Sequence, residues 1–241
     1  MAKFELKRLL EENTYPGRGI VIGKSSDGKK ALFAYFIMGR SENSRNRVFE
    51  RFDGGMRTKA FDETKVSDPR LIIYNAYLAC GNADIVTNGD QTDTIFRFVK
   101  EAPADPYAFE RALSTRVFEP DAPNFTPRVS GIARYDFAAQ TFTYKLSILK
   151  SGITPAVCRR FTFDYEPEDG IGHFIHTYVS DGAPIPSFVG EPEEVALPDT
   201  AEELADTVWN ALNPDNKVSL FVRAVPLDGS APTEIVCNKN V

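Results

Sequence analysis

The stretch GRGIVIGKS at residues 17–25, followed by ALFAYFIMG at residues 31–39, decides the fold. Both runs are rich in β-branched and aromatic residues, and the polar turn residues Lys24–Lys29 connect them. Such a pair is typical of a β-hairpin. Because Ile20–Ile22 and most of residues 31–38 are apolar, the hairpin is expected to lie centrally in a sheet.

Further strand patterns occur along the rest of the chain. Apolar and polar residues alternate at 128–136, 140–150 and 159–166, which predicts an antiparallel meander. Strands are also predicted at 84–90, which ends in an Asn-Gly turn, and at 217–225.

Helix signals are fewer than strand signals. Helices are predicted at 4–12, from Asp90 or Thr92 to about Val99, at 106–114, and from a capping box at Thr200 to Leu212. Three segments are less distinct: 71–78 is strand or helix, 40–59 is a basic loop or an edge segment, and 183–198 is a Pro-rich loop. Because strands come in blocks, the sequence predicts one α+β domain over residues 1–241 and not a doubly wound α/β sheet.

Charge is divided unevenly along the chain. The net charge is −6, yet residues 161–216 hold thirteen Asp or Glu and no Lys or Arg, which leaves 28 basic and 21 acidic residues elsewhere. Overall acidity argues against non-specific nucleic-acid binding, which depends on neutralising phosphates. A local basic site for one small anion stays possible.

The sequence carries no sign of a membrane segment or of export. It has no run of about 18 apolar residues, and its first residues include Glu5, Glu11 and Glu12 where a signal peptide needs an uncharged apolar centre. Three widely spaced cysteines indicate neither a disulfide framework nor a zinc site. We therefore expect a protein of the reducing cytoplasm, without a membrane partner.

The segment that follows the hairpin is rich in arginine. Residues 40–59 hold six Lys or Arg and three acidic residues, and Arg40, Arg45 and Arg47 alternate with short Ser and Asn side chains. A planar guanidinium matches phosphate or carboxylate oxygens in pairs. A charge run alone is as easily a solvated loop, but its place directly after a buried strand favours a rigid anion site.

A second candidate segment, Asn88–Asp93, lies at a predicted strand-to-helix junction. Free backbone amides at a helix N-terminus suit an anion or a polar amide. Because Asp90 and Asp93 would repel a phosphate, we favour recognition of a neutral group. The structural alternative is a turn with a helix cap.

A third candidate is the loop 118–128, which contains three prolines. Prolines fix the loop and limit its conformational entropy. Rigid placement of Glu119, Asp121 and Arg128 suits acid–base chemistry or ligand orientation, and a salt-bridged structural loop is the alternative. The only histidines, His173 and His176, lie in strand-rich sequence without a marked third ligand, so neither a metal site nor a Ser-His-Asp triad is predicted.

Taken together, these segments resemble the archaeal-type inosine monophosphate (IMP) cyclohydrolase family. The resemblance rests on five stretches in family order: YPGRGIVIG (15–23), Arg40-Ser41 with Asn46-Arg47, Tyr74-Asn75, NGDQTD (88–93), and Glu119-Pro120-Asp121 with Thr126-Pro127-Arg128. It implies a four-layer αββα sandwich like that of N-terminal nucleophile hydrolases. It also implies closure of 5-formamidoimidazole-4-carboxamide ribonucleotide to IMP with loss of water, without a metal or organic cofactor.

The same resemblance suggests which side chains take part. As catalytic residues we expect Glu119, Asp121, Tyr74 and Arg47. As residues that bind the purine ribonucleotide we expect Arg18, Arg40, Ser41, Asn46, Asn88, Gly89, Asp90 and Arg128.

Two features depart from the family pattern. The acidic part from about residue 180 is longer than expected, and it could serve as a lid or as a contact in a homo-oligomer. No Cys, Ser or Thr follows Met1, so the usual N-terminal nucleophile of this fold is missing. That absence fits a cyclohydrolase, which needs no acyl-enzyme. Two alternatives remain: a non-catalytic protein that binds purine ribonucleotides, and an amide hydrolase on the same scaffold.

Overall fold

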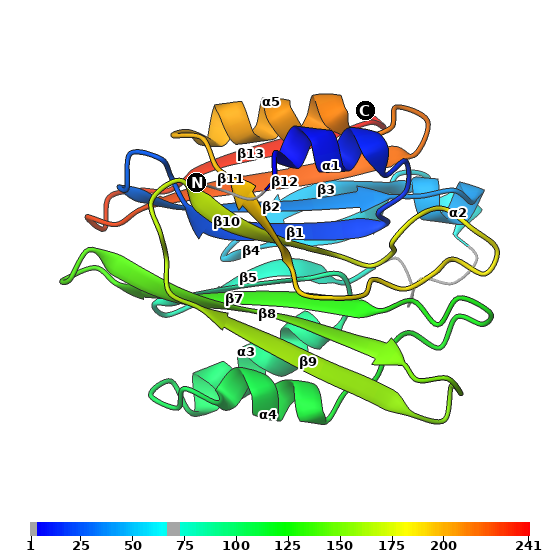
Figure 1. Cartoon of the computed structure of the whole chain (residues 1–241), viewed down its shortest axis with the longest axis horizontal. Coiled ribbons are helices and arrows are strands. Elements are labelled where there is room, and N and C mark those ends of the chain that lie inside the picture. Colours follow the sequence, from blue (N-terminus) through cyan, green and yellow to red (C-terminus); the bar gives the residue numbers. More distant parts are fainter. Residues whose placement is uncertain (1–3, 67–72) are drawn as a thin grey trace.

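A computed structural model describes residues 4–66 and 73–241 of the chain. It has an α+β fold with two antiparallel sheets and few helices, as the sequence predicts (Figure 1). No helix among the described residues is long and apolar enough to cross a membrane.

The first sheet has six strands in the order β11-β10-β1-β2-β12-β13. The predicted hairpin is confirmed as its centre, formed by β1 (Arg18–Lys24) and β2 (Lys30–Met38). The chain later adds four more strands to this sheet: β10 (Ile171–His176), β11 (Glu193–Ala196), β12 (Lys217–Pro226) and β13 (Thr233–Asn238). β10, from the acidic segment 161–216, and β12, which follows that segment, pair directly with the N-terminal hairpin.

The second sheet has seven strands in the order β3-β4-β5-β6-β7-β8-β9. The predicted meander is confirmed as β7 (Arg128–Asp136), β8 (Thr141–Ser151) and β9 (Cys158–Tyr165). The other strands are β3 (Arg47–Phe52), β4 (Gly55–Ala60), β5 (Asn75–Cys80) and β6 (Ala83–Thr87). The run 71–78 is thus a strand from Asn75 onward, and its first two residues lie outside the described part.

Alternation along the central hairpin explains how the sheets pack. Ile20, Phe33 and Tyr35 belong to an apolar core shared with residues of the second sheet. Val21 and Leu32 belong to a separate core that contains α1 (Leu6–Glu12) and α5 (Ala201–Ala211). Because successive side chains of a strand point to opposite faces, one hairpin serves both cores.

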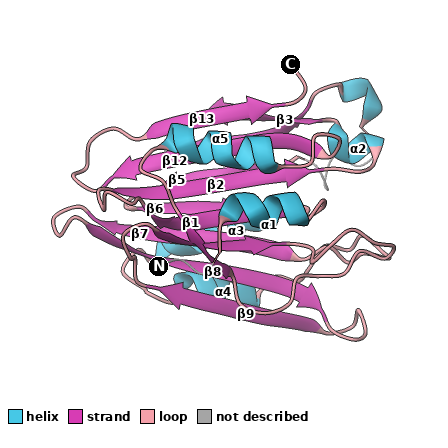
Figure 2. Cartoon of the chain, turned by 45° about the horizontal axis from the view of Figure 1, so that its top comes forward, coloured by secondary structure: helices cyan, strands magenta, loops and turns pink. Residues whose placement is uncertain are grey.

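Helices cover the outer faces of the two sheets (Figures 1 and 2). α1 and α5 lie on the first sheet, and α3 (Gln91–Glu101) and α4 (Ala108–Ser114) lie on the second. The capping box predicted at Thr200 is confirmed, with the Thr200 side chain accepting from the amide of Glu203. Two short helical turns complete the fold, α2 (Glu42–Arg45) and a 3₁₀ turn (Glu63–Lys65).

The structure decides one open alternative and corrects one prediction. Of the two possibilities for residues 40–59, the edge segment is confirmed, because these residues form α2 and the β3–β4 hairpin, with β3 at the sheet edge. Residues 183–198 are not wholly a loop, because they contain β11, which pairs with β10. In β4, the exposed Arg57 and Lys59 alternate with buried residues, which is a strand pattern that the net charge of the segment obscures.

Candidate functional site

The turn after β2 holds the basic segment in a fixed shape. Ser41 caps α2, because its hydroxyl oxygen accepts a hydrogen bond from the backbone amide of Ser44. The Ser44 hydroxyl oxygen accepts in turn from the backbone amide of Ser41. Gly39 makes this turn possible, because a side-chain carbon there would come within 2.6 Å of Ser44 Oγ. Arg40, next in the chain, pairs with Asp181 and lies over the Tyr15 ring.

The loop between α4 and β7 is also fixed by its own hydrogen bonds. Asp121 accepts from the backbone amide of Thr126 at 2.7 Å and from its hydroxyl at 2.5 Å. The Thr126 hydroxyl also lies 2.6 Å from that of Tyr178. Tyr178 in turn stacks on Tyr15, 5.9 Å between ring centroids, which ties this loop to the residues just before β1.

The basic turn and the loop 118–128 meet at two adjoining cavities of about 150 and 190 Å³. Arg18, at the start of β1, lines both of them. Ser41 and Ser44 contribute from one side, and Asp121 and Thr126 from the other. The smaller cavity adds Asn43, Asn88 and Glu119, and the larger one adds Tyr15, Arg40, Asn124, Tyr178 and Ile185.

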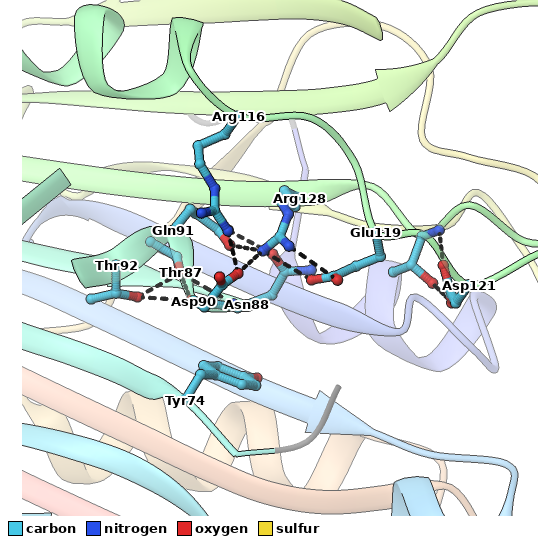
Figure 3. Close-up of polar contacts among 12 residues, drawn as sticks. Tyr74, Thr87, Asn88, Asp90, Gln91, Thr92, Arg116, Glu119, Asp121 and Arg128 are labelled. Atoms are coloured by element: carbon cyan, nitrogen blue, oxygen red, sulfur yellow. Dashed lines mark hydrogen bonds and ion pairs between the residues drawn. The ribbon is translucent and has the colours of Figure 1, made fainter. Parts of the chain in front are cut away.

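A nearly buried arginine organises the acidic side of the site (Figure 3). Arg128, at the start of β7, is 7% exposed. Its Nη1 donates to Asp90 at 2.6 Å and to Gln91 at 2.5 Å, and its Nη2 donates to Glu119 at 3.1 Å. Arg116 donates to the same Asp90 oxygen at 2.5 Å. Arg128 therefore holds three acceptors from two different loops in one place.

Gly89 lies where this network leaves no room for a side chain. A carbon added there would come within 2.6 Å of Arg128 Nη1, 2.7 Å of Gln91 Oε1 and 2.8 Å of Glu119 Oε1. The neighbouring Asn88 is committed to the backbone: its amide donates to Pro127 O, and its oxygen accepts from Val129 N. The turn is thus fixed by polar contacts, with glycine at its tightest point.

The electrostatics of Glu119 differ from those of an exposed glutamate. Burial raises its pKa, and the nearby carboxylates of Asp90 and Asp121 act in the same direction. The guanidinium groups of Arg128 and Arg18 oppose this rise without cancelling it. Glu119 can consequently take up or release a proton at a higher pH than an ordinary glutamate.

A second arginine, Arg47, is fully buried and poorly partnered. Its Nε donates to Ser44 O at 2.8 Å, but Nη1 and Nη2 have no hydrogen-bond partner among the described residues. Burial and the repulsion of Arg18 lower its pKa to about 10. Arg18 Nε is also buried without a partner in the described part of the chain. Two tyrosines lie near these arginines, Tyr35 and Tyr74, and their hydroxyls form a hydrogen bond of 2.7 Å with each other.

The structure therefore brings most of the expected site residues together. Arg18, Arg40, Ser41, Asn88, Glu119 and Asp121 line the cavities, and Gly89, Asp90 and Arg128 form the adjoining network. Tyr74 and Arg47 lie close to Arg18 without lining either cavity. Asn46 is placed elsewhere: its side chain bonds the backbone of Asp62 in both directions and lines a separate pocket.

Tyr178, which lines the larger cavity, and Tyr35, which lies near Arg18, were not expected as site residues from the sequence. Tyr35 lies inside the apolar run of β2, where an aromatic residue predicts only a core position. Tyr178 reaches the site because β10 pairs with β1, a contact across more than 150 residues of chain. Neither has a local sequence signal for its role.

Within residues 4–66 and 73–241, no group of His, Cys, Asp or Glu side chains is arranged to hold a metal ion. No curated protein matches the sequence. A family model described as IMP cyclohydrolase-like protein matches residues 15–229. Since this match covers most of the chain, including every residue that lines the two cavities, the chain belongs to the IMP cyclohydrolase-like family.

Proposed function

We propose that this protein is an IMP cyclohydrolase, which closes 5-formamidoimidazole-4-carboxamide ribonucleotide to IMP. One observation carries the proposal: Arg18, Glu119 and Asp121, from distant parts of the family-matched chain, line one cavity. That cavity therefore combines a cation for substrate oxygens with carboxylates that can move a proton. The two sheets and their helices would correspond to the four-layer αββα sandwich of N-terminal nucleophile hydrolases, as a single domain over residues 1–241.

The reaction needs few chemical groups because both reacting atoms belong to one substrate. The carboxamide nitrogen attacks the formyl carbon and forms the new ring bond. The carboxamide nitrogen and the formamido nitrogen each give up one proton, and the formyl oxygen leaves with both as water. Holding the substrate in one rotamer lowers the activation barrier by several kcal/mol, and by up to about 7–11 kcal/mol in well-oriented systems.

Proton transfer is assigned to the acidic side of the cavity. Glu119 takes the proton of the attacking carboxamide, because burial gives its carboxylate a raised proton affinity and Arg128 fixes its position. Asp121 is assigned to orienting the substrate and not to proton transfer, because both of its carboxylate oxygens already accept hydrogen bonds from Thr126. Asn88, Gly89 and Asp90 shape the wall that faces the carboxamide or the ribose.

Charge on the substrate oxygens is assigned to the basic side. Arg47 polarises the formyl oxygen together with Tyr74, since both Nη atoms of Arg47 lack an acceptor among the described residues. Arg40 lies at the exposed rim of the larger cavity with Ser41 and would clamp the 5′-phosphate. Arg18 lines both cavities and would contact the substrate between these two ends. Asn46 supports the segment indirectly through its bonds to Asp62.

The direct test supplies the purified protein with the formamido ribonucleotide and follows IMP by chromatography. The proposal expects IMP to form at a rate proportional to enzyme concentration, without added metal or cofactor. Binding without turnover would instead support a non-catalytic purine-ribonucleotide binding protein. Release of formate or ammonia without ring closure would support an amide hydrolase. Residence in the cytoplasm and homo-oligomer formation remain predictions.

Glu119→Gln tests the proton-transfer role. Glutamine keeps the shape but cannot accept the proton, so kcat should fall by about 10²–10⁴-fold. In the wild type, activity should decline on the acid side as Glu119 becomes protonated, at a pH above the ordinary glutamate range because its pKa is raised. That acid limb should be absent from the residual activity of Glu119→Gln.

A matched control is Glu110→Gln on α4. Glu110 forms an ion pair with Lys145 at 2.6 Å, away from both cavities. The control should keep the wild-type kcat and pH profile. Full activity in Glu119→Gln would reject an ionised carboxylate at this position.

A further inference from the structure

The two sheets are joined beside the site by a pair of tyrosine hydroxyls. Tyr35 comes from β2 in the centre of the first sheet, and Tyr74 precedes β5 of the second sheet. Their oxygens are 2.7 Å apart. The Tyr35 ring packs against Phe49 with 5.5 Å between ring centroids, so its position is set by the core.

The Tyr35–Tyr74 pair has one hydroxyl proton that its mutual hydrogen bond does not use. Two hydroxyls bring two protons, and the bond between them uses only one. No other hydrogen-bond partner of either hydroxyl exists among the described residues. The nearby charged groups are Arg18 and Arg47, and guanidinium groups only donate. One tyrosine proton is therefore left to point at an acceptor that this part of the chain does not provide.

Unused donors of Arg47 and Arg18 lie in the same region. Arg47 Nη1 and Nη2 and Arg18 Nε are buried and unpartnered among the described residues. Buried donors without acceptors are costly, so a set of them indicates a ligand oxygen. The proposed reaction supplies one, the formyl oxygen, which gains negative charge in the transition state and must leave protonated.

We infer that Tyr35 is a positioning residue for the ring closure: its hydroxyl donates to Tyr74 Oη and thereby directs the Tyr74 proton to the formyl oxygen. The inference rests on the proposed function. Tyr74 is assigned the contact with the substrate, because Tyr74 is 6% exposed and Tyr35 is 0% exposed. Burial also raises the pKa of Tyr35 well above the ordinary tyrosine value, which keeps Tyr35 protonated and able to donate.

The test is a double-mutant cycle of Tyr35→Phe and Tyr74→Phe, measured as kcat and KM. Phenylalanine keeps the ring packing and removes only the hydroxyl. Tyr35→Phe should lower kcat about tenfold with KM changed less than about threefold, since one directing hydrogen bond is lost. In the Tyr74→Phe background, Tyr35→Phe should have no further effect on kcat, because Tyr35 acts only through the Tyr74 hydroxyl.

Tyr144→Phe is the matched control. The Tyr144 hydroxyl is bonded to His173 Nδ1 at 2.7 Å, and its ring belongs to the core between the sheets. Loss of this buried hydroxyl should leave kcat unchanged, which separates loss of a hydroxyl in general from loss of the Tyr35 hydroxyl.

The outcomes distinguish the inference from the proposed function. An active wild type in which Tyr35→Phe keeps full kcat, or in which the two substitutions multiply their effects independently, overturns the role of Tyr35 and leaves the cyclohydrolase intact. A wild type that binds IMP and never forms it overturns the cyclohydrolase and the role of Tyr35 with it.

Discussion

Arg47→Met is expected to lose about 10²–10³-fold in kcat/KM and yet to be more stable than the wild type. The activity loss follows because Arg47 is assigned to the formyl oxygen, where removal of one donor costs this much. The gain in stability follows because the guanidinium is fully buried and its Nη atoms have no acceptor in the described part of the chain. Methionine fills the space without a charge and should raise the free energy of unfolding by about 1–4 kcal/mol.

The pH dependence of this difference follows from the lowered pKa of Arg47. Because that pKa is about 10 and the ordinary value is 12.5, keeping the group charged in the folded state costs free energy. The cost is present at neutral pH and declines as pH rises through about 10. The stability advantage of Arg47→Met should therefore narrow above that pH, as measured by urea unfolding.

Arg45→Met is the matched control for Arg47→Met. Arg45 belongs to the same basic turn, but its guanidinium bonds Gly39 O and Asn216 and stays exposed. It should change neither kcat/KM nor stability by much, since exposed polar contacts contribute little. An Arg47→Met variant that is strongly destabilised, or fully active, would show that the arginine serves the fold and not the reaction.

Asp84→Ala should cost about 3–5 kcal/mol of stability, the largest effect expected outside the site. Asp84 on β6 is 3% exposed and accepts from Tyr77 at 2.6 Å, Tyr135 at 2.8 Å and Arg223 Nε at 2.9 Å. Arg223 belongs to β12, so this cluster joins the two sheets through a charge pair. Removing the carboxylate takes one of two carboxylate partners from the mostly buried Arg223, which keeps Glu234, and leaves the Tyr77 and Tyr135 hydroxyls without their acceptor.

The measurement is urea unfolding of Asp84→Ala beside the double variant Asp84→Leu/Arg223→Met. Replacing both charges with apolar side chains removes the buried ion, so the double variant should recover part of the lost stability; the rest stays lost because the Tyr77 and Tyr135 hydroxyls lack their acceptor. Below the unfolding transition, Asp84→Ala should keep its catalytic rate, because the cluster lies outside both cavities. A loss below 1 kcal/mol would contradict the bridging role of Asp84.

The sequence predicts the central fold well because its strongest signals are local. The apolar hairpin and the capping box at Thr200 each lie within a few residues, and both are confirmed. β11 has only four residues and follows a proline-rich segment, so nothing local marks it. β13 pairs with β12 at the sheet edge and has only partly buried residues, so its apolar pattern is weak.

For the site, the sequence identifies the loops that contribute polar side chains, but it does not show which residues those side chains contact. Arginine after a buried strand and carboxylates braced by prolines are local patterns, and the structure places Arg40 and Asp121 in one cavity. The use of each polar group depends on contacts made only in the fold. Asn46 is an example, since its amide is taken by the Asp62 backbone, and Tyr35 is another, since its partner Tyr74 comes from the other sheet.

The most direct measurement is a crystal structure with the product IMP bound. We expect the purine in the cavity between Arg18 and Glu119 and the phosphate beside Arg40. The carbon that closes the pyrimidine ring should face Arg47 and Tyr74. A nucleotide bound instead at another pocket, such as the one between α1 and His176, with the Arg18 cavity empty, would contradict this assignment.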